Sequence, residues 1–311
     1  MNLLIALGGN ALEDGSQPTA ENQLKVIKSA VVYLADLIQA GHELVISHGN
    51  GPQVGRILVQ NEAAKALTPP LPLDVCGAMT QGAIGYQIQQ AMQAELAGRG
   101  IHKPVVSLVT QVMVDSADPG FQNPTKPVGI FYTKEEAEKI KAADPGFVMK
   151  EDAGRGWRRV VASPRPAGIC EIQAIQTLIK SGCVVVACGG GGIPVVKDGQ
   201  GVKGVAAVID KDFASELLAE ELDADTLIIL TGVDQVCLNY NKPDQKSLKA
   251  MNLAEAEEYI AQGQFAPGSM LPKVQAAMQF VRSKKGRRAL ITSLREVGPS
   301  LKGENGTWLG E

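Results

Sequence analysis

The stretch ELVISHGNGPQVG, residues 43–55, passes from an apolar run through a glycine-rich turn into a segment of helical character. Residues 43–47 have the apolar, β-branched composition of a buried strand, and a helical pattern begins near Val54. A turn between a strand and a helix exposes backbone N–H groups at the positive end of the helix dipole, where an anion can bind. The stretch therefore predicts an α/β fold with an anion site at the end of a strand.

Apolar runs of the same kind recur along the chain, separated by segments of helical period. The other runs are residues 3–7, 105–110, 183–188, 226–230 and 289–292. Between the runs at 3–7 and 43–47, apolar residues recur every three or four positions over residues 21–40, and Gly41 ends the pattern. Continuous apolar strands joined by amphipathic helices indicate a mainly parallel sheet buried on both faces. We therefore predict a three-layer αβα sandwich with an open, mainly parallel sheet.

A segment of about residues 118–167 interrupts this alternation and is dense in proline, glycine and aromatic residues. Five of the chain's 13 aromatic residues lie in it: Phe121, Phe131, Tyr132, Phe147 and Trp157. Its cationic residues include Lys126, Arg155, Arg158 and Arg159. A long irregular segment with its own aromatic residues is typical of a small inserted subdomain. Its cations favour the interpretation of this subdomain as a lid that covers an active site. A surface excursion without a role in function is the alternative interpretation.

The composition of the 311-residue chain is that of an ordinary globular protein, with 45% hydrophobic residues, 20% charged residues and a net charge of -3. Neither a nucleic-acid partner nor a membrane partner is expected. The basic stretch at 283–288 fits a solvated helix end better than a nucleic-acid patch, because acidic residues elsewhere offset it. Five cysteines without a CxxC pair and three histidines predict neither a protein-held metal nor a disulfide framework, and fit a reducing cytoplasm.

Two further glycine-rich segments follow apolar runs. Gly8-Gly9-Asn10 comes after residues 3–7, and four consecutive glycines at 189–192 come after residues 183–188. Glycines let backbone N–H groups approach a phosphate closely, although a glycine pair alone can equally be a tight turn. In the stretch at 49–55 the third glycine comes one residue too late for a Rossmann fingerprint, and no Walker A loop occurs. Dinucleotide binding and P-loop chemistry are therefore disfavoured.

Two lysines lie at predicted helix starts. Lys211 stands between Asp210 and Asp212, and Lys273 follows Pro272, a residue that suits the first turn of a helix. A lysine in that position opposes the helix dipole, so an anionic partner is expected. The group around Lys211 also fits a plain helix cap with a solvated ion pair.

Taken together and in this order, these segments resemble the amino-acid kinase superfamily and, within it, the carbamate kinase family, along essentially the whole chain. The most specific segments are residues 48–55, 123–129, 151–161, 207–213 and 268–273. Relatives such as acetylglutamate kinase carry a lysine on the first strand that contacts the transferring phosphoryl group, whereas this strand reads Ile5-Ala6-Leu7. The resemblance implies one amino-acid kinase domain over residues 1–311. Within it lie an acceptor lobe of about 1–205 with the insert at about 118–167, and a nucleotide lobe of about 206–311.

The activity implied by the resemblance is reversible phosphoryl transfer between ATP and carbamate, giving carbamoyl phosphate and ADP. It implies a reaction running towards ATP synthesis in arginine or related nitrogen catabolism, with Mg2+ on the nucleotide phosphates. The implied partners are these small molecules and a second copy of the chain in a homodimer. Such a transfer needs little covalent help, because cations and N–H groups that neutralise the phosphoryl oxygens supply the catalysis.

The resemblance also assigns residues to these tasks. The implied catalytic residues are Lys126, Lys211, Asp212 and Lys273. Of these, Lys126 is expected to replace the missing cation of strand one, and Asp212 is expected to orient the lysines. The groups expected to cradle the phosphoryl and carbamoyl groups are Gly8, Gly9, Asn10, Gly49, Asn50 and Gly51. The residues expected at the nucleotide are Thr231, Gly232, Tyr240 and Met270, beside Lys211 and Lys273.

Two other functions remain open at this point. Another superfamily enzyme that phosphorylates a different small carboxylate would share the ATP site and need a larger acceptor pocket. A non-catalytic nucleotide-binding regulator would keep the fold and lose a phosphate lysine, although all three lysines are present here.

Overall fold

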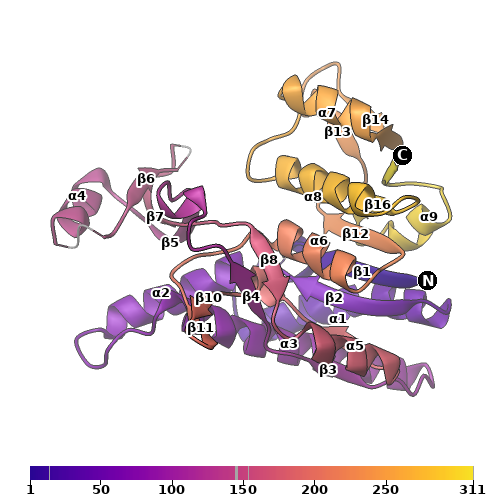
Figure 1. Cartoon of the computed structure of the whole chain (residues 1–311), viewed down its shortest axis with the longest axis horizontal. Coiled ribbons are helices and arrows are strands. Elements are labelled where there is room, and N and C mark those ends of the chain that lie inside the picture. Colours follow the sequence, from indigo (N-terminus) through magenta and orange to yellow (C-terminus); the bar gives the residue numbers. More distant parts are fainter. Residues whose placement is uncertain (14, 144–145, 153, 311) are drawn as a thin grey trace.

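An eight-stranded sheet forms the centre of the molecule (Figure 1), seen in a computed structural model that describes residues 1–13, 15–143, 146–152 and 154–310. The strand order is β15-β17-β16-β12-β1-β2-β9-β3. The bounds are β15 Ala250–Asn252, β17 Thr307–Gly310, β16 Arg288–Ser293, β12 Thr226–Thr231, β1 Asn2–Leu7, β2 Glu43–His48, β9 Val184–Val186 and β3 Val105–Ser107. All neighbours are parallel except β16 and β17. The predicted mainly parallel sheet is confirmed.

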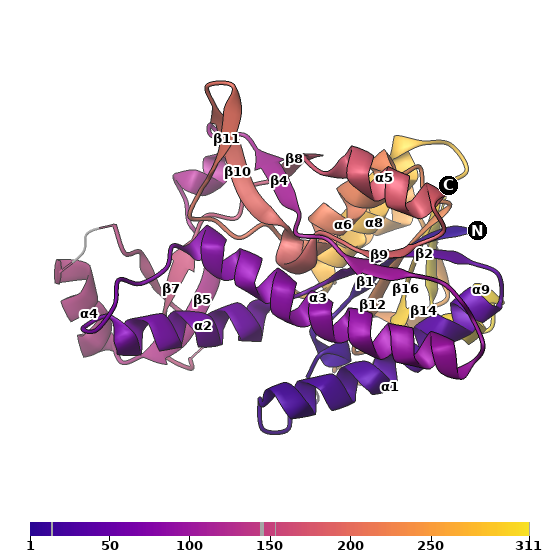
Figure 2. The same cartoon turned by 90° about the horizontal axis from the view of Figure 1, so that it is seen from below.

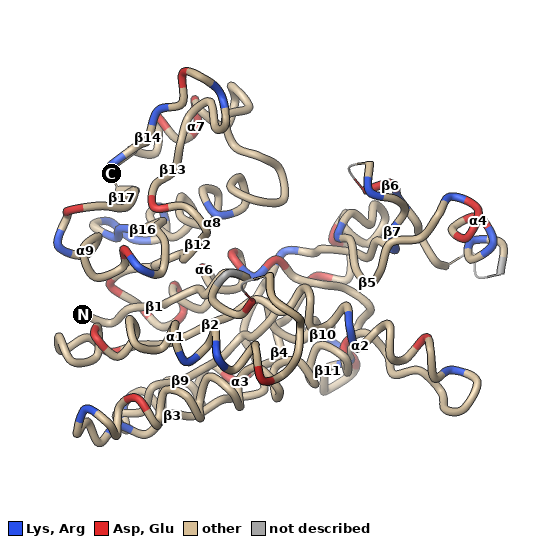
Figure 3. Tube along the Cα trace, turned by 180° about the vertical axis from the view of Figure 1, so that it is seen from behind, with Lys and Arg blue, Asp and Glu red and all other residues tan. Residues whose placement is uncertain are grey.

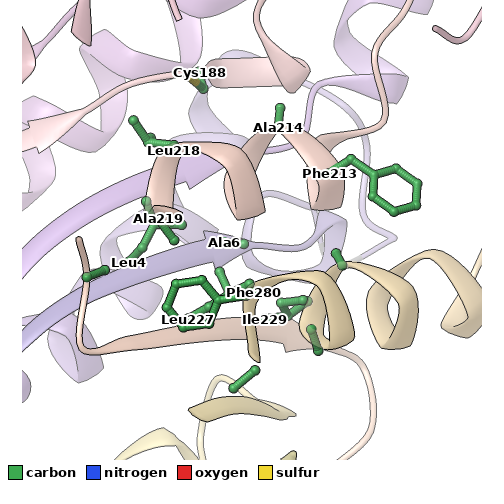
Figure 4. Close-up of a cluster of buried hydrophobic side chains, with 14 of the residues drawn as sticks. Leu4, Ala6, Cys188, Phe213, Ala214, Leu218, Ala219, Leu227, Ile229 and Phe280 are labelled. Carbon is green, nitrogen blue, oxygen red and sulfur yellow. The ribbon is translucent and has the colours of Figure 1, made fainter. Parts of the chain in front are cut away.

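The strands are apolar on both faces because helices cover both. Leu3, Ile5 and Leu7 of β1 pack in one buried cluster with α1 (Ala20–Gln39) and α3 (Leu73–Gly98). Leu4 and Ala6 point the other way, into a cluster with α5 (Ile172–Lys180), α6 (Lys211–Glu221) and α8 (Met270–Ser283). Figure 2 shows α1 beneath the sheet and α5 above it, and Figure 4 shows the second cluster. The three-layer sandwich is therefore confirmed.

Helix boundaries follow local sequence signals. Thr19 accepts a hydrogen bond from Asn22 N–H at the start of α1, and Gly41 beyond its end has a φ of +87°. Helix α2 (Gly51–Ala64) begins three residues before the predicted start at Val54. The prediction was late because Pro52 lies in the first turn, where its missing N–H costs nothing.

Smaller sheets lie outside the central one. A four-stranded sheet has the order β11-β10-β4-β8, with bounds Gly201–Gly204, Ile193–Asp198, Gln111–Val114 and Pro166–Ile169. Strands β13 (Val236–Leu238) and β14 (Lys246–Leu248) form a pair next to α7 (Leu253–Ala261). A short α9 (Val297–Leu301) packs against α1 and β16.

The aromatic-rich insert forms a separate unit that projects from the body (Figure 1). It contains a three-stranded sheet of order β5-β7-β6 and the helix α4 (Lys134–Ala143). The strand bounds are β5 Lys126–Tyr132, β7 Trp157–Val161 and β6 Met149–Glu151. We call residues 118–165 the lid. Its β5 packs against α2 of the body.

The basic stretch at 283–288 has acidic partners. Lys284 Nζ and Arg287 Nη2 each lie 2.8 Å from a carboxylate oxygen of Asp223, at the far end of α6. Lys and Arg also alternate with Asp and Glu over the rest of the trace (Figure 3). These ion pairs favour the interpretation of the stretch as a solvated helix end.

Candidate active site

The glycine-rich segments meet at one edge of the central sheet. Because β12, β1, β2 and β9 are parallel neighbours, their carboxyl ends lie side by side. Strand β1 runs into a 3-10 turn at Gly9–Ala11, β2 into α2, and β9 into a 3-10 turn at Gly189–Gly191. Gly49 N–H donates to Leu7 O at 3.2 Å, which joins the first two turns directly.

The glycines at this edge have two different tasks. A Cβ on Gly8 would lie 2.5 Å from Leu230 O, and a Cβ on Gly191, whose φ is +95°, would lie 2.3 Å from Ile209 O. These two glycines are therefore required by close packing between loops. A Cβ on Gly9 or Gly51 would meet nothing within 4 Å, so these two border open space that a ligand can enter.

Asp212 holds the two lysines that the sequence singled out. Its Oδ1 lies 2.5 Å from Lys211 Nζ and its Oδ2 lies 2.9 Å from Lys273 Nζ. Asp212 is 3% exposed; burial opposes its ionisation, but the two lysines lower its pKa to about 2. The carboxylate therefore stays ionised and pairs with two cations, one from α6 and one from α8.

Desolvation also shifts the pKa of Lys211. Burial lowers its pKa, and the charge of Asp212 opposes that change. Its side chain also lies against the second glycine turn, because a Cβ on Gly49 would be 3.8 Å from Lys211 Cδ. The stem of Lys211 thus lies beside the loop after β2, and its ammonium group pairs with Asp212.

Lys126 reaches the same region from the lid. Its Nζ lies 2.8 Å from Asp210 Oδ2, and Asp210 Oδ1 accepts a hydrogen bond from Asp212 N–H at 2.9 Å. Asp210 is the N-cap of α6. From the sequence, Asp210 was predicted only as part of a plain helix cap around Lys211, and its contact with the lid was not predicted.

A cavity of about 200 Å³ lies beside this cluster and brings predicted phosphate and nucleotide residues together. Its lining comes from the loops after β1 and β12 and from the start of α8: Gly8, Gly9, Ala11, Leu230, Thr231, Gly232, Gly268, Ser269, Lys273 and Leu294. Two predicted nucleoside residues do not line it, since Tyr240 is 54% exposed and Met270 packs half-buried against the core. The side chain of Asn10 lies outside the described residues.

The remaining predicted residue, Asn50, is bound to the body. Its Nδ2 donates to Thr80 Oγ1 of α3 at 2.8 Å, and a Cβ on Gly190 would collide with its amide. Gln81 of α3 braces the same loops, because its Nε2 donates to Gly189 O and its Oε1 accepts from Thr110 N–H. A buried polar side chain that the hydrophobic pattern cannot explain was the available signal for Gln81.

His48 is buried and uncharged. Burial lowers its pKa to about 4, and its Nδ1 lies 2.8 Å from Gly49 O, so the neutral ring carries its proton on Nδ1. The imidazole also fills the space in front of Gly189, where a Cβ would lie 2.4 Å from Nε2. His48 therefore shapes two glycine turns without adding a charge.

Three arginines of the lid contact acidic or aromatic residues of the lid itself. Arg155 and Arg158 both pair with Asp152, and the guanidinium of each lies 5.0 Å from the Phe131 ring centroid. Arg159 lies over Phe147 at 4.1 Å. Of the lid cations named from the sequence, Lys126 is the one with a described ion pair to the body.

Known proteins with similar sequences and structures identify the family of the chain. The model of the "Amino acid kinase family" matches residues 1–293. The carbamate kinase of Clostridium perfringens (strain 13 / Type A) is 57% identical over 311 residues, covering 99% of each chain, and carbamate kinase 1 of Enterococcus faecium is 56% identical, covering 97% of this chain and 96% of the relative. The solved structure of carbamate kinase from Giardia lamblia bound to AMP-PNP has a TM-score of 0.94 at 45% identity, covering 99% of this chain and 98% of that one.

An aspartate kinase structure from Synechocystis, at 14% identity and a TM-score of 0.56, shares the fold. The chain therefore belongs to the amino acid kinase family and, within it, to the carbamate kinases.

Proposed function

We propose that the chain transfers a phosphoryl group reversibly between ATP and carbamate, giving carbamoyl phosphate and ADP. The observation that carries the proposal is the convergence of Lys126, Lys211 and Lys273 on the two carboxylates at the start of α6. Three cations from three elements can neutralise the equatorial oxygens of a phosphoryl group in flight. Carbamate is already an anionic nucleophile, so no proton has to be removed from it before the transfer.

The first strand distinguishes this site from other acceptor chemistries of the superfamily. Ala6 is fully buried in the core cluster beneath the sheet edge, so β1 supplies no cation to the phosphoryl group. Lys126 supplies one from the lid instead. The proposal also places the acceptor in a lobe of about residues 1–205 and the nucleotide in a lobe of about 206–311.

Purified protein supplied with ADP, carbamoyl phosphate and Mg2+ is expected to produce ATP. Formation of ATP is followed by a coupled luminescence assay, with acetyl phosphate as the control donor. Activity with acetylglutamate or aspartate as acceptor, together with none for carbamoyl phosphate, would contradict the proposal. We further propose that the reaction runs towards ATP synthesis in arginine or related nitrogen catabolism, in the cytoplasm.

Mg2+ is proposed to travel with the nucleotide. Asp210 and Asp212 are both engaged by lysine ammonium groups, and among the described residues no group of three or more His, Cys, Asp or Glu side chains could hold a metal. The donor set therefore fits a cation coordinated mainly by phosphate oxygens and water. Bound there, it would offset phosphate charge alongside Lys211 and Lys273.

A homodimer is proposed from an exposed apolar stripe on α3. Val75, Met79 and Tyr86 lie on one side of the helix, and they are 38%, 45% and 61% exposed. The helix packs against β3, the edge strand of the central sheet, and Val109 just beyond that strand is 52% exposed. An apolar stripe beside an open sheet edge suits a two-fold contact with a second copy. Among the described helices, none is long and apolar enough to span a membrane.

The double substitution Met79→Glu with Tyr86→Glu is expected to convert a dimer into monomers, because charges on facing copies of the stripe would be desolvated and repel one another. Sedimentation velocity measures the change. Glu substitutions at two exposed α1 positions, Lys25 and Lys28, serve as controls for surface charge. A variant that sediments as the wild type does would rule out this face as the interface.

A further inference from the structure

Asp210 performs two contacts with one carboxylate. Oδ1 caps α6 by accepting from Asp212 N–H, and Oδ2 pairs with Lys126, which is 84 residues away in the chain. A cap alone needs one oxygen. The second oxygen holds the lid cation next to the turn that carries Lys211 and Asp212.

The two ion-pair groups at this site differ in burial. Asp212 has a side chain 4% exposed, with Lys211 and Lys273 at 13% and 15%, so that group is permanently shielded. In the other pair, Lys126 is 33% exposed and Asp210 is 17% exposed. Ion pairs this accessible contribute little to stability and exchange partners readily. A phosphoryl group carries more negative charge than a carboxylate, so it would displace Asp210 as the partner of Lys126.

Asp210 also lies among other cations. Burial lowers the pKa of Lys211 and of Arg165, and the negative charge of Asp210 opposes this change in both. Arg165, at the end of the lid, lies over the Phe213 ring at 3.4 Å. A negative charge at Asp210 therefore reduces the positive potential that an incoming phosphoryl group meets.

The neck of the lid keeps Lys126 within reach. Val208 N–H donates to Ala162 O at 2.9 Å, and Ala162 and Ala207 form a parallel bridge. Thr125 N–H, next to Lys126, donates to Val161 O at 3.2 Å. Lys126 can therefore change partners by rotation of its side chain, and its ion pair with Asp210 adds to the contacts that hold the neck against the body.

We propose that Asp210 is a positioning residue that competes with the phosphoryl group for Lys126: it holds the lysine beside α6 between turnovers and releases it to the substrate. This inference rests on the proposed function and adds the group that controls its lid cation. Asp210 acts through Lys126, and no proton or bond changes at Asp210 itself.

Asp210→Asn is the decisive variant, because Asn keeps an oxygen for the Asp212 N–H and loses the charge that binds Lys126. The KM for carbamoyl phosphate is expected to fall by roughly three- to tenfold with kcat nearly unchanged, because the lost ion pair stabilises the free enzyme and its loss favours bound substrate and transition state equally. Asp198→Asn, on the exposed β10–β11 turn, is the control for loss of one negative charge. A role in capping alone would leave KM unchanged in Asp210→Asn.

A double-mutant cycle isolates the pairing. In a Lys126→Ala background, assayed at raised enzyme concentration, Asp210→Asn is expected to leave KM unchanged. Hydrogen exchange tests the resting contact without any turnover: the amides of Thr125 and Val208 are expected to exchange faster in Asp210→Asn than in the wild type. An unchanged or raised KM, the same KM shift without Lys126, or equal exchange would overturn the inference. If the wild type made no ATP from carbamoyl phosphate, the proposed function would fail while the exchange comparison still decided the pairing.

Discussion

Lys211→Ala is expected to lower kcat for ATP formation by roughly 100- to 1000-fold while changing the affinity for ADP far less. The reason is that Lys211 is held by Asp212 at 2.5 Å at the start of α6, with its stem beside the Gly49 turn after β2. A fixed cation stabilises the charge that develops in the transition state more than it stabilises the bound ground state. Initial rates give kcat, and calorimetric titration gives the affinity for ADP.

The control for this prediction addresses stability. Removing one lysine from a buried ion-pair group can cost about 3 to 5 kcal/mol of folding free energy, because the remaining charges lose a partner. Lys211→Met keeps the apolar stem and leaves Asp212 paired with Lys273, so thermal unfolding near that of the wild type with turnover still lost would separate catalysis from folding. Lys203→Ala, an exposed lysine on β11, controls for net charge. Near-normal turnover of Lys211→Ala would instead support the plain helix-cap interpretation.

The central sheet could be predicted because its strands are buried on both faces and lie next to amphipathic helices. In β1, alternate residues serve opposite core clusters, so the whole strand is apolar and easily recognised. The short four-stranded sheet was not predicted. Its strands pair across long separations, as in Ile193 with Gln111, and local patterns carry no information about such partners.

In the candidate site too, features that depend on local sequence could be predicted, and contacts between distant segments could not. Lys211 and Lys273 stand out locally because each opposes a helix dipole, and the structure joins them through Asp212. The contact between Lys126 and Asp210 could not be predicted, since it depends on how the lid folds back on α6. The contacts of Arg155 and Arg158 could not be predicted for the same reason, because their pairing with Asp152 and Phe131 exists only within the folded lid.

Lys126→Ala is expected to reduce turnover by roughly 100- to 1000-fold and to leave the affinity for ADP nearly unchanged. The phosphoryl oxygens need a cation that β1 does not supply, because Ala6 is buried in its place. Lys126 starts β5 between Pro124 and Pro127, which restrict the backbone and limit the entropy lost on positioning the lysine. The residues that line the cavity beside Thr231 and Lys273 do not include Lys126, so nucleotide binding is expected to survive.

The lid is also expected to move as one body and to become more resistant to proteolysis when substrates bind. Its sheet and α4 are held by ring–cation contacts, such as Arg159 over Phe147 and Lys141 over Trp157. A cavity of about 500 Å³ leaves part of the interface between the lid and α2 unpacked, while Val128 and Val161 of the lid pack with Val54 of α2. Trypsin cleavage within residues 150–159 should slow when ADP and carbamoyl phosphate are present, and ADP alone should protect less, because the phosphoryl group is what Lys126 binds. In Lys126→Ala the added protection by carbamoyl phosphate should disappear while that by ADP remains. Equal cleavage with and without substrates, or normal turnover in Lys126→Ala, would show that the lid is a fixed structural extension and that the missing cation comes from elsewhere.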